Sequence, residues 1–119
     1  MSMNVESDFD YITDYDLKVC LDYMKHDNIY DVFTYEWKEI QGRQYTYYMK
    51  FKEYKNSWWR RLGNCPVQAF EVIFEELGDQ TAIHVNFIRG PLGLFLQFVT
   101  DKYIDMFWKQ KLNAQRTNI

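Results

Sequence analysis

Cysteine and histidine are scarce in this chain of 119 residues, which has two of each. Cys20 and Cys65 lie far apart in the sequence, so nothing suggests the disulfide framework of a small secreted domain. His26 and His84 do not stand at metal-ligand spacing with a cysteine or with each other. A glycine-rich phosphate loop and a Gly-x-Ser-x-Gly motif are also missing. The sequence therefore predicts reduced thiols, and it predicts neither a metal site, nor a cofactor, nor a catalytic residue.

Long hydrophobic runs are missing as well. The longest, Pro91 to Val99, is about half of what a membrane-spanning helix needs, and Asp101 and Lys102 follow it closely. The first residues form neither a basic nor an apolar leader region. We therefore expect a cytoplasmic protein that does not span a membrane. Internal repeats and linkers are absent, which predicts a single domain over residues 1–119.

Aromatic residues, in contrast, are abundant: they make up 19% of the chain, within a hydrophobic share of 47%. This gives more contact area than a small core needs, and we expect some of these side chains to line a pocket or a contact surface. The alternative is that exposed tyrosines simply follow from their preference for strands.

Charge is distributed unevenly. Residues 1–31 carry eight acidic and two basic side chains, so their net charge of −6 is larger than the total of −3. Residues 43–61 combine six basic side chains with aromatic ones, a mixture that single-stranded nucleic-acid binders also use. Contact with nucleic acid or with anionic lipid is one hypothesis for this segment. A solvated strand face is the favoured interpretation, since the whole protein is acidic.

Alternation with a period of two indicates strands in several segments. Phe9 to Tyr15 fits a short edge strand, because its aspartates disfavour a central position. Val32 to Ile40 and Tyr45 to Phe51 predict a hairpin around Gln41-Gly42. Ala69 to Leu77 and Thr81 to Arg89 predict another around Gly78-Asp79, and Trp58 to Leu62 a short strand between the two hairpins.

Two segments favour helices. Asp16 to Asp31 places Leu17 and Leu21 at helical spacing, with Asp16 at the start. Leu92 to Ala114 follows Gly90-Pro91, where proline suits a first helical turn. Two apolar stripes run along this second helix, whereas a helix lying on one flat sheet shows a single stripe. The prediction is an α+β fold in which a curved antiparallel sheet grips a long C-terminal helix, with a short N-terminal helical segment.

The stretch Phe70 to Val85, followed by Gly90-Pro91-Leu92-Gly93 and a long helix, resembles the end of START-like helix-grip proteins, the superfamily of polyketide cyclases and lipid-transfer domains. The resemblance implies an apolar pocket between the sheet and the C-terminal helix. It implies binding of a hydrophobic small molecule or lipid, and only occasionally catalysis. The predicted ligand-binding residues are Tyr35, Trp37, Tyr45, Tyr47, Met49, Phe70, Phe74, Phe87, Leu96, Val99, Tyr103 and Phe107. The alternative is that these same residues simply fill the core.

A second hypothesis is a protein interaction module, homodimeric in one version, with exposed aromatic anchors at Trp108, Phe98 and one of Trp58 or Trp59. His84 alternates with the apolar positions of its strand, which predicts an exposed side chain without a chemical role. Glu71 and Glu75 recur on the same side of a strand, as solvent-facing residues do.

Overall fold

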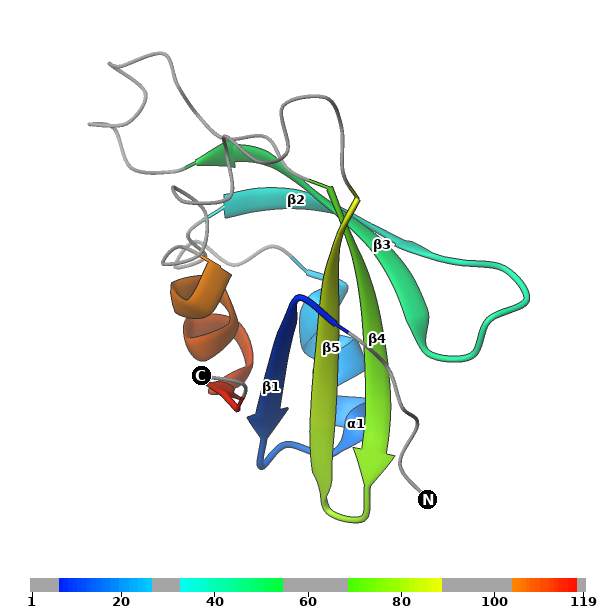
Figure 1. Cartoon of the computed structure of the whole chain (residues 1–119), viewed down its shortest axis with the longest axis vertical. Coiled ribbons are helices and arrows are strands. Elements are labelled where there is room, and N and C mark those ends of the chain that lie inside the picture. The colour runs from blue at the N-terminus through cyan, green and yellow to red at the C-terminus, as the bar shows by residue number, and fades with distance from the viewer. Residues whose placement is uncertain (1–6, 27–32, 55–68, 89–103, 118–119) are drawn as a thin grey trace.

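A six-stranded antiparallel sheet forms the centre of the protein in a computed structural model, which describes residues 7–26, 33–54, 69–88 and 104–117 (Figure 1). The strand order is β2-β3-β4-β5-β1-β6. The elements are β1 (Phe9–Thr13), α1 (Leu17–Met24), β2 (Phe33–Glu39), β3 (Thr46–Tyr54), β4 (Ala69–Leu77), β5 (Gln80–Ile88) and β6 (Gln115–Arg116). Residues 104–112 are helical and are called the C-terminal helical segment below. The α+β class and the antiparallel sheet are thus confirmed.

Both predicted hairpins are present. β4 and β5 pair from Ala69 opposite Ile88 to Leu77 opposite Gln80, around a turn in which Gly78 has a φ of 70°. That left-handed conformation suits glycine, so the Gly-Asp signal marks the turn correctly. In the other hairpin, Trp37 lies opposite Met49 and Glu39 opposite Tyr47. The predicted strand Trp58 to Leu62 lies outside the described residues.

The first strand is not an edge strand as predicted. β1 pairs with β5 along its whole length and with β6 through Tyr11 and Ile12. Its acidic neighbours are compatible with this position because they have partners across the sheet. The Asp8 carboxylate accepts the main-chain N–H of Phe87 at 2.9 Å, and the main-chain carbonyl of Asp10 accepts the N–H of Thr117 at 2.9 Å.

The N-terminal helix is shorter than predicted. Asp16 is its N-cap and accepts the main-chain N–H of Val19 at 2.9 Å, and Lys25 is its C-cap. The remainder of the prediction, residues 27–31, lies outside the described residues. Tyr35 donates its hydroxyl to the Met24 carbonyl at 2.8 Å, so a side chain of β2 satisfies one of the helix's terminal carbonyls.

One face of the sheet, called the inner face here, carries the core. Alternate residues of the strands are buried there, among them Phe51, Phe70 and Ile83. Helix α1 adds Leu17, Cys20 and Met24 to the same cluster. The C-terminal helical segment contributes Ile104, Phe107, Trp108 and Leu112. On the opposite, outer face Ile73 is also buried, as its apolar character among glutamates indicates.

The predicted long gripping helix is not shown: the described helical segment is short and covers residues 104–112. Residues 92–103 lie outside the described part of the chain, and the segment ends two residues before the predicted Ala114. Asn113 has a φ of 51°, the left-handed conformation that often terminates a helix. The Leu112 carbonyl accepts the Thr13 hydroxyl at 2.5 Å, which ties this helix end to β1. Within the residues that the structure describes, no helix is long and apolar enough to span a membrane.

Candidate functional site

Nine of the twelve predicted ligand-binding residues belong to the described part of the chain, and the structure gathers them in one cluster. Leu96, Val99 and Tyr103 lie outside it. The buried members are Tyr35, Met49, Phe70, Phe74 and Phe107, and the partly exposed members are Trp37, Tyr45, Tyr47 and Phe87. The division between these two groups decides which of them a ligand can reach.

The buried group packs the C-terminal helical segment onto the sheet. The Phe107 ring lies 5.4 Å from that of Tyr35 and 5.2 Å from that of Phe51, both in edge-on geometry. Met49, Phe51, Phe70 and Phe107 are 0% exposed. These surfaces are entirely covered by protein atoms, so this group acts as core.

The partly exposed group contains a compact set of rings near the turn between β2 and β3. Trp37 and Tyr47 are stacked face to face, with ring centroids 4.5 Å apart and planes 11° apart. Phe74 meets both rings edge-on, at 6.0 Å from Trp37 and 5.9 Å from Tyr47. Trp37, Tyr45, Tyr47 and Phe74 are called the aromatic site below. Trp37 and Tyr47 present a large rigid apolar surface that is still open to solvent.

Tyr45 is held in an unusual backbone conformation at the edge of this site. Its φ is 54°, which residues with a side chain rarely adopt. The Tyr45 carbonyl accepts the main-chain N–H of Phe74 at 3.0 Å, and the turn closes with a bond from the Ile40 N–H to the Thr46 carbonyl at 2.9 Å. These bonds offset the strain of the conformation and fix Tyr45 next to β4.

A carboxylate adjoins the same rings. Glu39 lies opposite Tyr47 in the strand register and is exposed. Burial raises the pKa of the Tyr47 phenol, and the negative charge of Glu39 and the neighbouring Tyr45 raise it further. Among the described residues, no basic side chain pairs with Glu39. Glu39 is not among the ligand-binding residues predicted from the sequence, although its alternation with Tyr35 and Trp37 places it on the same face of β2.

An open depression of about 660 Å³ lies elsewhere, over the solvent side of α1. None of the described residues that line it is a predicted ligand-binding residue. Its described lining combines charged and apolar side chains, namely Lys18, Val19, Leu21, Asp22, Tyr23 and Lys25.

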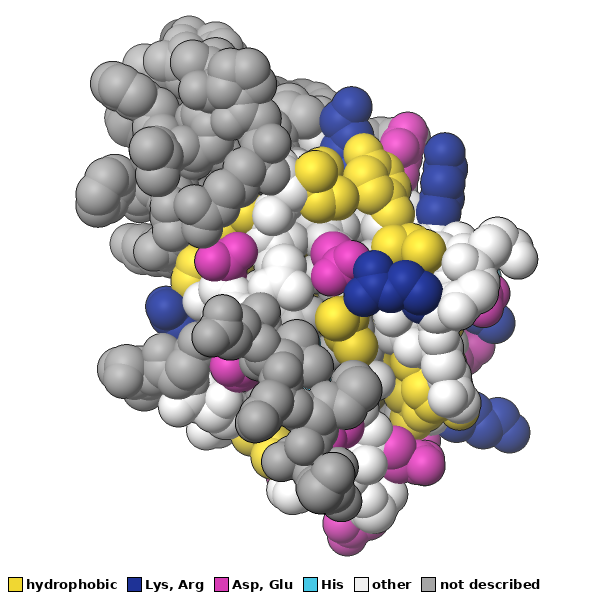
Figure 2. Space-filling view, turned by 45° about the vertical axis from the view of Figure 1, so that its right-hand side comes forward, with side chains coloured by type: hydrophobic (Ala, Val, Ile, Leu, Met, Phe, Trp, Pro, Cys, Tyr) yellow, Lys and Arg dark blue, Asp and Glu magenta, His cyan; other side chains and the backbone are white. Residues whose placement is uncertain are grey.

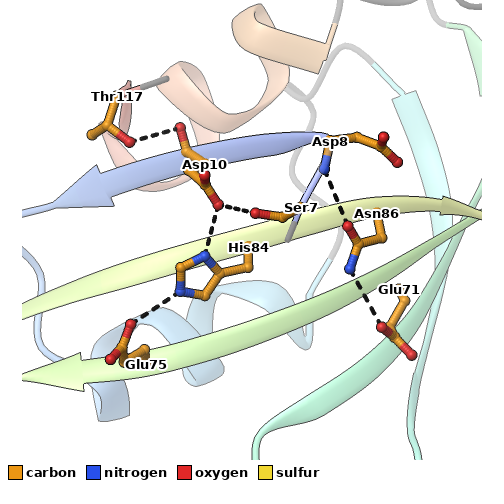
Figure 3. A network of polar contacts seen from close by, with 8 residues as sticks. All are labelled: Ser7, Asp8, Asp10, Glu71, Glu75, His84, Asn86 and Thr117. Carbon is orange, nitrogen blue, oxygen red and sulfur yellow. Dashed lines mark hydrogen bonds and ion pairs between the residues drawn. The ribbon is translucent and has the colours of Figure 1, made fainter. Parts of the chain in front are cut away.

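The outer face carries a polar network around His84 (Figure 3). The Nδ1 atom of His84 lies 2.7 Å from an Asp10 carboxylate oxygen, and Nε2 lies 3.1 Å from one of Glu75. Ser7 donates its hydroxyl to Asp10. The prediction of an exposed His84 is therefore wrong, since its side chain is only 12% exposed. With both ring nitrogens engaged by carboxylates, His84 links β1, β5 and β4 and has no nitrogen left for a substrate.

No metal site emerges from these groups. Within the part of the chain that the structure describes, no three His, Cys, Asp or Glu side chains are arranged to hold an ion. Glu71 belongs to the same outer face, where it accepts a 2.6 Å bond from Arg43. Part of the basic segment 43–61 is thus paired with an acidic strand residue, and residues 55–61 lie outside the described chain.

The predicted interaction anchor Trp108 is not exposed. It is 0% exposed and packs between Tyr11, at 6.0 Å, and Phe107, at 5.2 Å. Phe98, Trp58 and Trp59 lie outside the described residues. In the space-filling view, hydrophobic side chains occur in small groups separated by acidic and basic ones (Figure 2). Among the described side chains on this face, no broad apolar patch of the kind that a stable protein interface uses is seen.

No family model, no curated protein and no solved structure matches this chain. The function must therefore be argued from the site itself.

Proposed function

We propose that the protein is a non-enzymatic binder of a hydrophobic small molecule or lipid, and that the aromatic site on the inner face of the sheet is the contact surface. The observation that supports this most directly is the stacked pair of Trp37 and Tyr47, which leaves aromatic area partly exposed over Phe74. Ligand sites typically combine such apolar walls with a few polar groups at the rim.

The proposal includes the predicted arrangement of a sheet around a long C-terminal helix. The buried contacts of Phe107 with Tyr35 and Phe51 are consistent with a helix held against the inner face. Leu96, Val99 and Tyr103 are proposed to belong to the helix side of the ligand site. The resemblance to START-like proteins supports the same arrangement.

A test uses N-phenyl-1-naphthylamine, an uncharged aromatic probe whose fluorescence rises in apolar surroundings. We expect saturable binding to the intact protein and roughly fivefold weaker binding to Tyr47→Ala, because about 1 kcal/mol of aromatic contact is lost. The control is Tyr48→Ala. Tyr48 is the next residue of β3 and, by the alternation of a strand, lies on the outer face.

Circular dichroism shows whether each variant keeps its fold. The proposal fails if the intact, folded protein shows no saturable binding. It also fails if Tyr48→Ala weakens binding as much as Tyr47→Ala does, because the probe then does not distinguish the two faces.

A further inference from the structure

The open side of the aromatic site is bordered by a single negative charge. Trp37, Glu39 and Tyr47 lie on the same face of the β2–β3 hairpin, and Glu39 is directly opposite Tyr47. The rings and the carboxylate are therefore neighbours because of strand register, which the turn at residues 40–46 fixes.

Two features of this arrangement attract positive charge. The faces of tryptophan and tyrosine carry the negative part of the ring quadrupole, which favours a cation placed over them. Glu39 adds a full negative charge, and among the described residues no Lys or Arg neutralises it. An anionic ligand, in contrast, would lie beside an unpaired carboxylate of the same sign.

We infer that the preferred ligand of the aromatic site is a compact organic cation of the alkylated-ammonium type, held against the exposed side of the stacked Trp37–Tyr47 pair and beside Glu39. A methylated ammonium group suits this combination because it is positively charged yet largely covered by methyl groups. It gives up little hydration when it contacts apolar rings, whereas a bare ammonium binds water strongly. The inference rests on the proposed function and specifies the chemical class of its ligand.

The electrostatic effect of Glu39 on the ring beside it agrees with this geometry. Burial is the main cause of the raised pKa of Tyr47, and the negative charge of Glu39 raises it further. The negative charge of Glu39 would attract a cation that contacts Tyr47.

The experiment compares choline with 3,3-dimethyl-1-butanol, an uncharged molecule of nearly the same shape. Binding to the full chain is followed by two-dimensional NMR through the indole N–H signal of Trp37, assigned with Trp37→Phe, at ionic strength matched with sodium chloride. We expect choline to bind roughly tenfold more tightly than the neutral isostere, since a cation–π contact and an exposed charge pair each contribute about threefold, or about 0.7 kcal/mol.

Glu39→Gln removes the charge and keeps the shape of the side chain, so it should reduce the preference for choline to about threefold. Glu36→Gln is the matched control: Glu36 lies in the same strand on the opposite face, and the preference should remain unchanged. Equal binding of choline and its isostere, or equal effects of the two variants, would overturn the inference.

The failures of the two proposals can be told apart. If N-phenyl-1-naphthylamine binds with dependence on Tyr47 but choline shows no preference, the hydrophobic site stands and the inference about charge is wrong. If neither compound shifts the Trp37 signal and the naphthylamine does not bind, both are wrong.

Discussion

At the scale of single residues, the clearest chemical consequence of burial concerns Cys20. Its thiol is 0% exposed and lies on the core side of α1. Burial raises its pKa from 9.0 to about 11, a hydrogen bond with Thr81 opposes this, and the nearby charge of Asp16 adds to it. The thiolate is the reactive form of cysteine, so Cys20 is chemically inert in the folded protein.

We expect iodoacetamide at pH 8 to modify Cys20 about a hundredfold more slowly in the folded chain than in urea, following the difference in thiolate fraction. Peptide mapping by mass spectrometry after timed quenching measures this. Equal rates in the two states would show that the thiol is accessible.

The same shift predicts a pH dependence of stability. Because the folded-state pKa is the higher one, the contribution of the protonated thiol is fully present below pH 9 and is lost as the pH rises towards 11. Comparing the free energy of unfolding of the protein with that of Cys20→Ala over this range isolates the effect, since both proteins carry the same other titrating groups.

Prediction from the sequence was weakest for the contact partners of individual residues. Alternation placed Trp37, Tyr47 and Phe74 on apolar strand faces, and all four members of the aromatic site were among the predicted ligand-binding residues. It did not anticipate that both nitrogens of His84 would meet carboxylates, because Asp10 is 74 positions away in the chain. The burial of Trp108 likewise depends on Tyr11, a residue of the first strand. Long-range pairs of this kind carry no local sequence signal.

At the scale of elements, the strands with regular alternation and a glycine turn were predicted well. Ala69–Leu77 was predicted with its observed limits, and β5 begins one residue earlier than expected. α1 was predicted at its start, where Asp16 provides a capping signal, but not at its end. Tertiary contacts hold the carbonyls at its last residue and just beyond it. Tyr35 bonds to the Met24 carbonyl, and Lys111 bonds to the His26 carbonyl at 2.5 Å.

The cap at the start of α1 gives a testable energy. Asp16→Ala should lower the free energy of unfolding by about 1 kcal/mol, because the main-chain N–H of Val19 loses its acceptor. Urea unfolding followed by circular dichroism measures the change. Asp16→Asn keeps a cap-competent oxygen and should cost much less, so a similar loss in both variants would assign the effect to the charge of the aspartate rather than to the cap.

At the scale of the whole molecule, Phe107 joins the C-terminal helical segment to the inner face of the sheet. It contacts Tyr35, Phe51 and Trp108 within 5.4 Å and is 0% exposed. The sequence predicted Phe107 on the sheet-facing side of its helix. It left open whether the ring fills the interior or lines a pocket, because the fit of side chains from three separate elements depends on their final packing.

Phe107→Ala should therefore destabilise the protein by about 3–5 kcal/mol, the cost of removing a large buried ring. The neighbouring Met106 is 37% exposed, and Met106→Ala should change the free energy of unfolding by less than about 0.5 kcal/mol. Urea denaturation of both variants provides the comparison. Similar losses would contradict the assignment of residue 107 to the core.

The position of β1 between β5 and β6 has a consequence for folding. One edge of β1 pairs with β5, and the other is covered through Tyr11 and Ile12 by Gln115–Arg116, which lies far along the sequence. Until this distant pair forms, β1 displays an unpaired strand edge, and such edges recruit strands from other molecules. Slow docking of residues 115–116 onto β1 would therefore favour association between partly folded molecules.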